Sequence, residues 1–232
     1  MLLHPFVARV MPPLAIIYVF GVSCSLVHTL AHALAGKALG ADVEEIRLFG
    51  GPAIARVRLG GFLWVVNLLP GLGGYVKFRV KAIDEFSKGF EDLHPLRRIL
   101  VIAAGSLTIV AVLLVCLGPV NGTLSIWHGF REVVRGGLDP VAVGVPLVRS
   151  LFQLIRISPP STSLGIIAAK MAAFNLLPLL GLDGGLILWN PAQWRVCFSD
   201  RIALGATTVG LVAVCILCCG WLHAIARVLI FG

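Results

Sequence analysis

Charged residues are scarce in this chain, and their scarcity limits the classes of protein it can belong to. Asp, Glu, Lys and Arg make up 13% of the 232 residues, whereas 58% are hydrophobic. The mean hydropathy of +0.97 lies far from the balance of a soluble domain. The composition therefore predicts an α-helical integral membrane protein.

Long apolar stretches take the place of the missing charge. A helix needs about 20 residues to cross a bilayer, and four stretches of sufficient length occur, at residues 12–36, 99–119, 163–189 and 202–230. We expect about four transmembrane helices in one membrane domain over residues 1–232. Residues 124–156 space their apolar side chains like short helices that lie in the membrane interface on the external side.

The segment between the first two stretches has a different pattern. Residues 46–80 alternate apolar and polar side chains and contain repeated glycines and a proline, which is typical of strands in hairpins. Open strands are not tolerated in lipid, because their backbone groups stay unpaired. We therefore expect a re-entrant β-hairpin element that packs against protein or lines a wet cavity, with an ordinary interfacial loop as the alternative.

Acidic residues are especially few, at 11 against 19 Lys and Arg, which gives a net charge of +8. No nucleic-acid motif or aromatic-interleaved basic surface accompanies this charge, so we expect no nucleic-acid partner. Twelve Lys and Arg lie in residues 37–98 and 190–201, against six in the segments on the opposite side. By the positive-inside rule, residues 37–98 and 190–201 face the cytoplasm and both termini lie outside.

One glutamate is missing from an otherwise familiar pattern. The stretch "VHTLAHALAG" puts His28 and His32 one helical turn apart, as in the zinc hydrolase signature H-E-x-x-H. The position of the signature's general base is occupied by Thr29. The histidine pair alone can arise by chance, so further ligands are needed to support a metal site.

The third apolar stretch supplies such a ligand. It contains Asp183, together with Asn175 and Pro178, among Leu, Ile and Ala. Ionisable residues inside a membrane are costly and usually functional. Two histidines and one aspartate form the kind of three-ligand set that catalytic zinc sites use with water as the fourth ligand.

Several motifs together resemble one family. "HTLAH", "LFGG", "LLPGLGGYVKF", "AAGSL" and "FNLLPLLGLDGG" are similar, in order and spacing, to motifs of the site-2 proteases, which are intramembrane zinc metalloproteases. The last stretch matches the family pattern N-x-x-P-x-x-x-L-D-G residue for residue. The PDZ domain of the best-known bacterial members has no counterpart, so the resemblance implies a compact form. It also implies a bacterial cytoplasmic (inner) membrane, with the site toward the cytoplasmic side.

The resemblance assigns roles to individual positions. It makes His28, His32 and Asp183 the ligands of a zinc cofactor. Further positions are expected to bind an unwound transmembrane segment of another protein, partly by strand addition. These positions are Asn175, Pro178, Gly73, Gly74 and Tyr75.

Two departures bear on activity. Thr29 replaces the family's glutamate, and a hydroxyl is a poor general base because its proton affinity lies far from neutral pH. Lys170 stands where relatives have a small or amide residue. Its ammonium would repel a dication if it faced the site and would be neutral if it extended outward, so Lys170 is a candidate modifier of the site.

The sequence thus favours a catalytically impaired pseudoprotease that binds a transmembrane segment or serves as a subunit of a larger membrane complex. The alternative is an active intramembrane zinc metalloprotease that cleaves single-span membrane proteins in regulated intramembrane proteolysis. A transporter is disfavoured, because no inverted repeat is evident.

Overall fold

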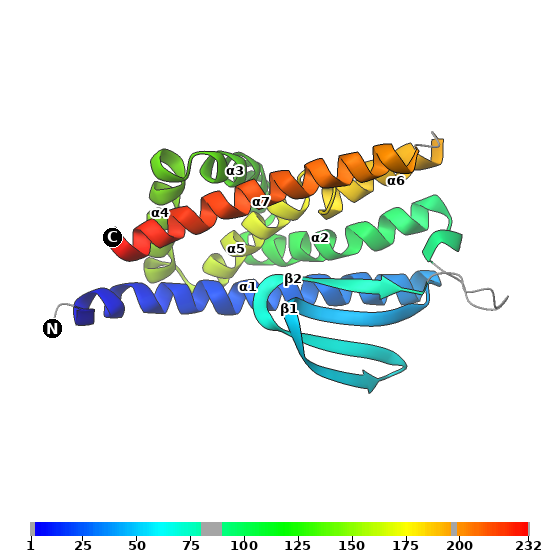
Figure 1. Ribbon diagram of the computed structural model, residues 1–232. Helices are drawn as coiled ribbons and strands as arrows, with labels where there is room; N and C mark the ends of the chain where they lie inside the picture. Colours follow the sequence, from blue (N-terminus) through cyan, green and yellow to red (C-terminus); the bar gives the residue numbers. More distant parts are fainter. Residues whose placement is uncertain (1–2, 80–89, 196–198, 232) are drawn as a thin grey trace.

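The computed structural model describes residues 3–79, 90–195 and 199–231, and it consists of apolar helices with a β-sheet beside the first helix (Figure 1). The first turn of α1 and the last turn of α7 lie at the same end of the bundle. The helices are α1 (Leu3–Leu39), α2 (Pro95–Leu117), α3 (Pro119–Leu138), α4 (Val145–Ile157), α5 (Pro160–Asn175), α6 (Asp183–Arg195) and α7 (Asp200–Phe231). Short turns of helix at Phe90–Asp92 and Pro140–Gly144 precede α2 and α4.

Four helical segments of the described chain are long and apolar enough to cross a membrane, which confirms the predicted number. They are Pro12–Leu39, Pro95–Leu117, Pro140–Ile157 and Arg201–Phe231. Three of them match predicted spans. The remaining one, Pro140–Ile157, falls where short interfacial helices were expected, and its α4 portion lies across the ends of α1 and α7 rather than alongside them (Figure 1).

The predicted span at 163–189 is instead two helices, α5 and α6, separated by residues 176–182. Pro178 lies in this break and lacks the N–H that a continuous helix needs. Gly181 has a φ of 106°, in the left-handed region that favours glycine. The chain therefore leaves helical geometry before Asp183 and starts a new helix at that residue.

Helix α5 forms the centre of the bundle because small side chains let its neighbours approach closely. Ala168, Ala169 and Ala172 are fully buried and pack in one cluster with Ile109 and Leu113 of α2. These contacts fix α2 against α5, and α2 also packs along α1. The packing brings α1, α2 and the start of α6 to a common point.

The β element is an antiparallel pair of long strands, β1 (Val43–Leu59) and β2 (Phe62–Phe78), which confirms the predicted β-hairpin element. The strands begin and end within three residues of the predicted 46–80 segment. Both strands bend back, so that residues 45–48 pair with residues 74–77 and also with residues 63–66. The sheet lies beside the C-terminal half of α1 (Figure 1).

One face of the sheet packs on α1. Ala33 of α1 forms a buried cluster with Val43 and Ile46, and Trp64 and Phe78 of β2 pack against it. Gly36 of α1 lies so close to Phe78 that a Cβ there would lie 2.3 Å from the ring. Protein contacts therefore hold the re-entrant element on this face. Lipid offers no hydrogen-bond partners to the backbone of a strand, so such contacts are expected for a strand at membrane depth.

Candidate metal centre

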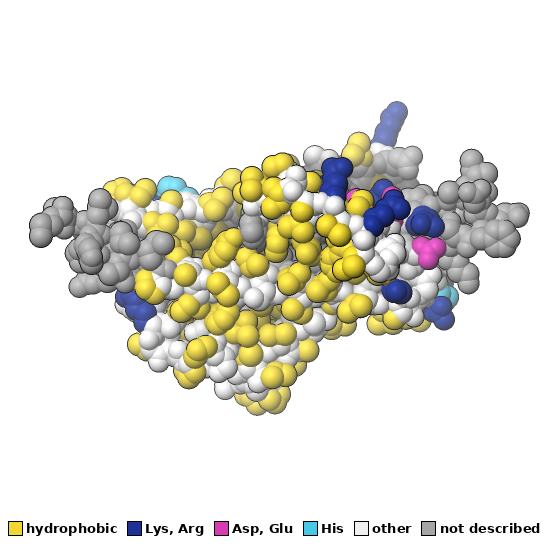
Figure 2. All heavy atoms as spheres, turned by 90° about the horizontal axis from the view of Figure 1, so that it is seen from below, with side chains coloured by type: hydrophobic (Ala, Val, Ile, Leu, Met, Phe, Trp, Pro, Cys, Tyr) yellow, Lys and Arg dark blue, Asp and Glu magenta, His cyan; other side chains and the backbone are white. Residues whose placement is uncertain are grey.

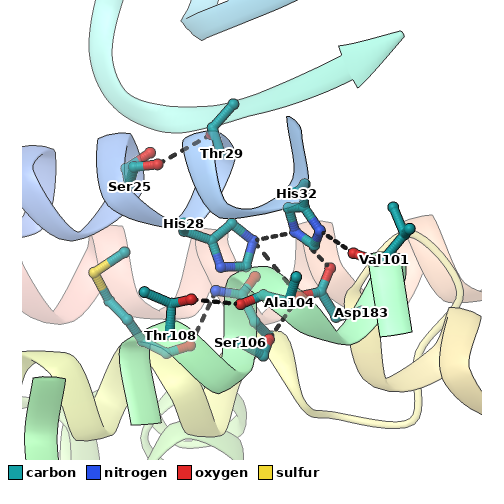
Figure 3. Close-up of polar contacts among 11 residues, drawn as sticks. Ser25, His28, Thr29, His32, Val101, Ala104, Ser106, Thr108 and Asp183 are labelled. Carbon is teal, nitrogen blue, oxygen red and sulfur yellow. Dashed lines mark hydrogen bonds and ion pairs between the residues drawn. The ribbon is translucent and has the colours of Figure 1, made fainter. Parts of the chain in front are cut away.

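Three side chains from two helices converge at one point, as Figure 3 shows. His28 and His32 come from α1, and Asp183 is the first residue of α6. Their ligand atoms all lie within 4.8 Å of one another, and Asp183 is buried. The structure thus brings together the three residues expected as metal ligands, although 151 positions separate His32 from Asp183 in the sequence (183 − 32).

The distances between the donor atoms fit zinc. The two Nε2 atoms are 3.1 Å apart. Asp183 Oδ2 lies 3.6 Å from His28 Nε2, and Asp183 Oδ1 lies 3.5 Å from His32 Nε2. Zinc–ligand bonds of about 2.0–2.1 Å at tetrahedral angles place donor atoms about 3.3 Å apart. The donor set and its spacing therefore match a tetrahedral zinc site with one position left for a fourth ligand.

Neighbouring groups fix the orientation of two of the three ligands. His32 Nδ1 lies 2.8 Å from the carbonyl oxygen of Val101. A carbonyl only accepts, so Nδ1 carries the proton and the lone pair of the neutral ring is on Nε2, which faces the cluster. Ser106 donates a hydrogen bond of 2.6 Å to Asp183 Oδ2. Both partners belong to α2, which makes this helix the outer support of the site.

Glycine at position 105 allows α2 to pass directly over the cluster. A Cβ at Gly105 would lie 2.3 Å from His32 Nε2 and 2.7 Å from His28 Nδ1. No side chain larger than hydrogen fits at this distance. The "AAGSL" motif therefore contains Gly105, which leaves space for the two histidine rings, and Ser106, which hydrogen-bonds Asp183.

The turn before Asp183 also depends on glycines. A Cβ at Gly184 would lie 2.2 Å from the carbonyl oxygen of Leu176, and one at Gly185 would lie 2.2 Å from that of Leu179. The loop at 176–182 therefore wraps tightly around the start of α6. This geometry explains the "LDGG" sequence: the glycines let the loop place Asp183 at the helix N-terminus, where a carboxylate is electrostatically favoured.

Thr29 lies on a different face of α1 from the two histidines. Its hydroxyl donates a 3.0 Å hydrogen bond to the carbonyl oxygen of Ser25, and the side chain is buried. Figure 3 shows it turned toward β2 while His28 and His32 point to Asp183. A Cβ at Gly74 of β2 would lie 2.7 Å from Thr29 Oγ1. The hydroxyl is thus enclosed between its own helix and the strand.

The described carboxylates near the sheet are engaged elsewhere. Glu45 pairs with Arg47 at 2.8 Å, and Glu44 pairs with Lys77 at 3.0 Å. Asp84 and Glu85, two further carboxylates between the first two apolar stretches, lie outside the described residues. Asp183 is the one carboxylate that the described chain contributes to the three-residue cluster.

The residues expected to bind a substrate segment belong to two separate parts of the structure, strand β2 and the region between α5 and α6. Gly73, Gly74 and Tyr75 belong to β2, where Gly74 contacts Thr29. Asn175 ends α5 and donates to the carbonyl oxygen of Met171 in its own helix, and Pro178 is exposed in the loop before Asp183. Their role in binding stays a prediction.

Lys170 is not brought to the metal ligands. Its ammonium forms an ion pair with Glu132 of α3, and both side chains are about one-third exposed. The sequence left open whether this ammonium would face the site and repel a dication, and the ion pair directs it to α3 instead. Glu132, which the sequence reading did not single out, is therefore the partner that decides where Lys170 points.

Fold and site together define a membrane protein with a three-residue group that could hold a metal ion, and comparisons with known proteins point to a family of metallopeptidases. The sequence profile of Peptidase family M50 matches residues 15–217. The chain is 31% identical over 131 residues to a predicted zinc metalloprotease of Chlamydia pneumoniae, covering 50% of this chain and 21% of that protein. A protein of the same description from Chlamydia trachomatis is 32% identical over 106 residues, covering 40% of this chain and 17% of its own length.

A third relative, a predicted zinc metalloprotease of Clostridium perfringens, is 32% identical over 109 residues, covering 46% of this chain and 31% of its own length. The matched stretches thus span less than a third of each relative. The chain belongs to Peptidase family M50, the site-2 proteases. The zinc cofactor expected from the sequence agrees with the descriptions of these relatives and with the three-residue group.

Proposed function

We propose that this chain is a metal-binding pseudoprotease that holds a transmembrane segment of another membrane protein, or joins a larger membrane complex, without efficient cleavage. The observation that carries the proposal is the position of Thr29. Its hydroxyl replaces a carboxylate, donates to the Ser25 carbonyl and faces β2 rather than the metal ligands.

The residues of the site can bind a metal ion and orient its ligands without a general base at position 29. His28, His32 and Asp183 would hold the metal, while Val101 and Ser106 orient two of these side chains. Zinc, when bound, supplies Lewis-acid polarisation of a peptide carbonyl and acidifies a water. Removing that water's proton still needs an acceptor, and loss of general-base assistance costs about 10²–10⁴-fold in rate.

The C-terminal part of β2 is the surface on which we expect the partner segment to lie. Its residues 74–77 pair with β1 on one side, and no strand of the described chain pairs with the other side, where strand addition could occur. Tyr75 is 49% exposed and stacks under the guanidinium of Arg47 at 5.1 Å. Gly74 brings this strand next to the helix that carries both histidines. Asn175 and Pro178 would contact the partner from the opposite side.

A second candidate function is an active intramembrane zinc metalloprotease that cleaves single-span membrane proteins in regulated intramembrane proteolysis. The complete ligand set, with spacings that fit zinc, favours it. This alternative requires a proton acceptor other than residue 29.

The proposed location is the cytoplasmic membrane of a bacterium, with the site toward the cytoplasmic side and both termini outside. The relatives come from bacteria. The first turn of α1 and the last turn of α7 share one end of the bundle (Figure 1), and the sheet with its basic residues lies toward the other.

Photo-crosslinking tests the binding role. A photoreactive phenylalanine analogue at position 75 is expected to crosslink a tagged single-span signal-peptide remnant in reconstituted membranes, and the adduct should contain the uncut segment. The sequence offers a matched control, because its only other tyrosine, Tyr18, is 52% exposed on α1. The same analogue at position 18 should give much less adduct. Equal yields at both positions, or an adduct made of cleaved fragments, would contradict the proposal.

A further inference from the structure

The part of the sheet farthest from the metal centre is a two-stranded hairpin that extends past α1. It is made of residues 53–59 of β1 and residues 62–67 of β2, and we call it the outer hairpin. Gly60 and Gly61, both with positive φ, close it. Residues 51–61 are all exposed. The strand that contacts Thr29, residues 74–77, lies on the other side of residues 45–48, so the outer hairpin is separate from the proposed binding strand.

One face of the outer hairpin continues the apolar face that packs on α1. Val57 lies opposite Trp64, and Leu59 lies opposite Phe62, so each pair projects to the same side of the sheet. Trp64 and Phe62 pack against the Ala33 cluster. Val57 and Leu59 extend beyond the helix and are 57% and 66% exposed. The structure therefore leaves a hydrophobic extension of the sheet uncovered by the described protein.

The opposite face carries two arginines. Arg56 and Arg58 alternate with Val57 and Leu59 and so project to the other side. Among the residues that the structure describes, neither forms an ion pair, whereas Arg47 and Lys77 of the same sheet are paired with Glu45 and Glu44. Figure 2 shows that most of the Lys and Arg side chains visible on this side of the molecule lie toward one end, beside a broad hydrophobic surface.

The position of the sheet beside α1 indicates what the outer hairpin contacts. It lies beside α1 rather than beyond its end, so a bilayer crossed by the long helices meets the hairpin laterally (Figure 1). Within the described residues, 53–59 pair with a strand on one side only, which disfavours the hydrocarbon layer, where unpaired backbone groups are not tolerated. Trp64 and Lys37, which lies over the Phe62 ring, are side chains typical of the headgroup level.

We propose that the outer hairpin is a docking surface for anionic phospholipid headgroups. Val57 and Leu59 enter the boundary between headgroups and acyl chains, while Arg56 and Arg58 bind the phosphates, as the basic and apolar faces of interfacial helices do. Two arginines near an anionic surface favour docking by about 10- to 30-fold. This surface is independent of whether the chain cleaves its partner, and it anchors one side of the sheet beside the metal centre.

Hydrogen–deuterium exchange of the full chain in nanodiscs tests the proposal. Amides of residues 53–59 are expected to exchange about tenfold more slowly in discs that contain phosphatidylglycerol than in discs of phosphatidylcholine alone. R56Q/R58Q should remove the difference, and R56K/R58K should keep most of it, which separates loss of charge from misfolding. R131Q/R135Q, which removes the same charge from α3, serves as the matched control and should behave like the unmodified chain.

Four results would overturn the proposal. They are equal exchange in both lipids, a difference that survives R56Q/R58Q, a difference that R131Q/R135Q also removes, and equal protection by inorganic phosphate in neutral discs. The last result would assign the arginines to a free anion rather than to the lipid surface.

Discussion

At the scale of single residues, the metal centre depends on one hydroxyl that the metal-ligand pattern does not include. Ser106 donates to Asp183 Oδ2 and so fixes the carboxylate that completes the ligand set. Partners of this kind typically contribute 10- to 100-fold to metal affinity. This hydrogen bond gives the chain a specific way to hold its aspartate.

Replacing Ser106 tests this support. Ser106→Ala is expected to weaken zinc binding by about 10- to 100-fold, because Asp183 loses its 2.6 Å donor. The measurement is zinc affinity by competition with a chromogenic chelator. Thr108→Ala is the control, since Thr108 lies on the same helix and donates to the carbonyl of Ala104 in that helix. Equal affinities for the two variants would show that the serine has no role in the site.

The sequence predicted the three residues that the structure brings together as a possible metal-binding group, but not the residues that hold them in place. His28 and His32 follow from helical spacing, and Asp183 follows from the cost of an intramembrane carboxylate together with the family resemblance. Ser106 and Glu132 act through contacts with residues 77 and 38 positions away, which no local pattern reports. The sequence did not show whether Lys170 faces the metal ligands, for the same reason. The direction of its side chain depends on Glu132 in another helix.

At the scale of elements, the close approach of α2 to α1 determines whether the site can form. Gly105 is the contact point, since any Cβ there would overlap His32 Nε2 and His28 Nδ1. Cores of this density respond to one added methyl group by shifting backbone or side chains. In this case the side chains that must shift are metal ligands.

Gly105→Ala is therefore expected to reduce bound zinc to a small fraction of the wild-type amount, while the helices stay folded. Metal content per chain, measured by mass spectrometry after purification in zinc, gives the result directly. Gly21→Ala in α1 is the matched control, because a Cβ at Gly21 meets nothing within 4 Å. Full zinc content in Gly105→Ala would contradict the described packing of α2 on the ligands.

Helices and strands could be predicted from the sequence where hydropathy or alternation determines the structure. They were harder to predict where tertiary packing determines it. The β element at Val43–Phe78 follows from alternation of apolar and polar residues, and three of the four spans follow from the length of the apolar stretches. The division of the 163–189 stretch into α5 and α6 does not follow from hydropathy, because Pro178 and the glycines break the helix without making it polar. Residues 140–157 form one continuous helical stretch despite two prolines, because Pro140 and Pro146 each lie in a first helical turn, where proline is tolerated.

At the scale of the whole molecule, three parts meet at one point: a helical bundle that carries the metal ligands, a sheet that lies next to the helix of both histidines, and a loop that places Asp183. The proposed partner segment would enter between β2 and the loop at 176–182. The central claim is that this arrangement has its ligands but lacks its base.

The measurement that tests this claim most directly is cleavage of a tagged single-span signal-peptide remnant by the zinc-loaded, reconstituted chain. We predict no cleavage by the unmodified protein and detectable cleavage by Thr29→Glu, with a rate higher by at least about 10²-fold. The double variant Thr29→Glu/His28→Ala should be inactive again. Cleavage by the unmodified protein that disappears in His28→Ala would contradict the account and establish an active protease with another base.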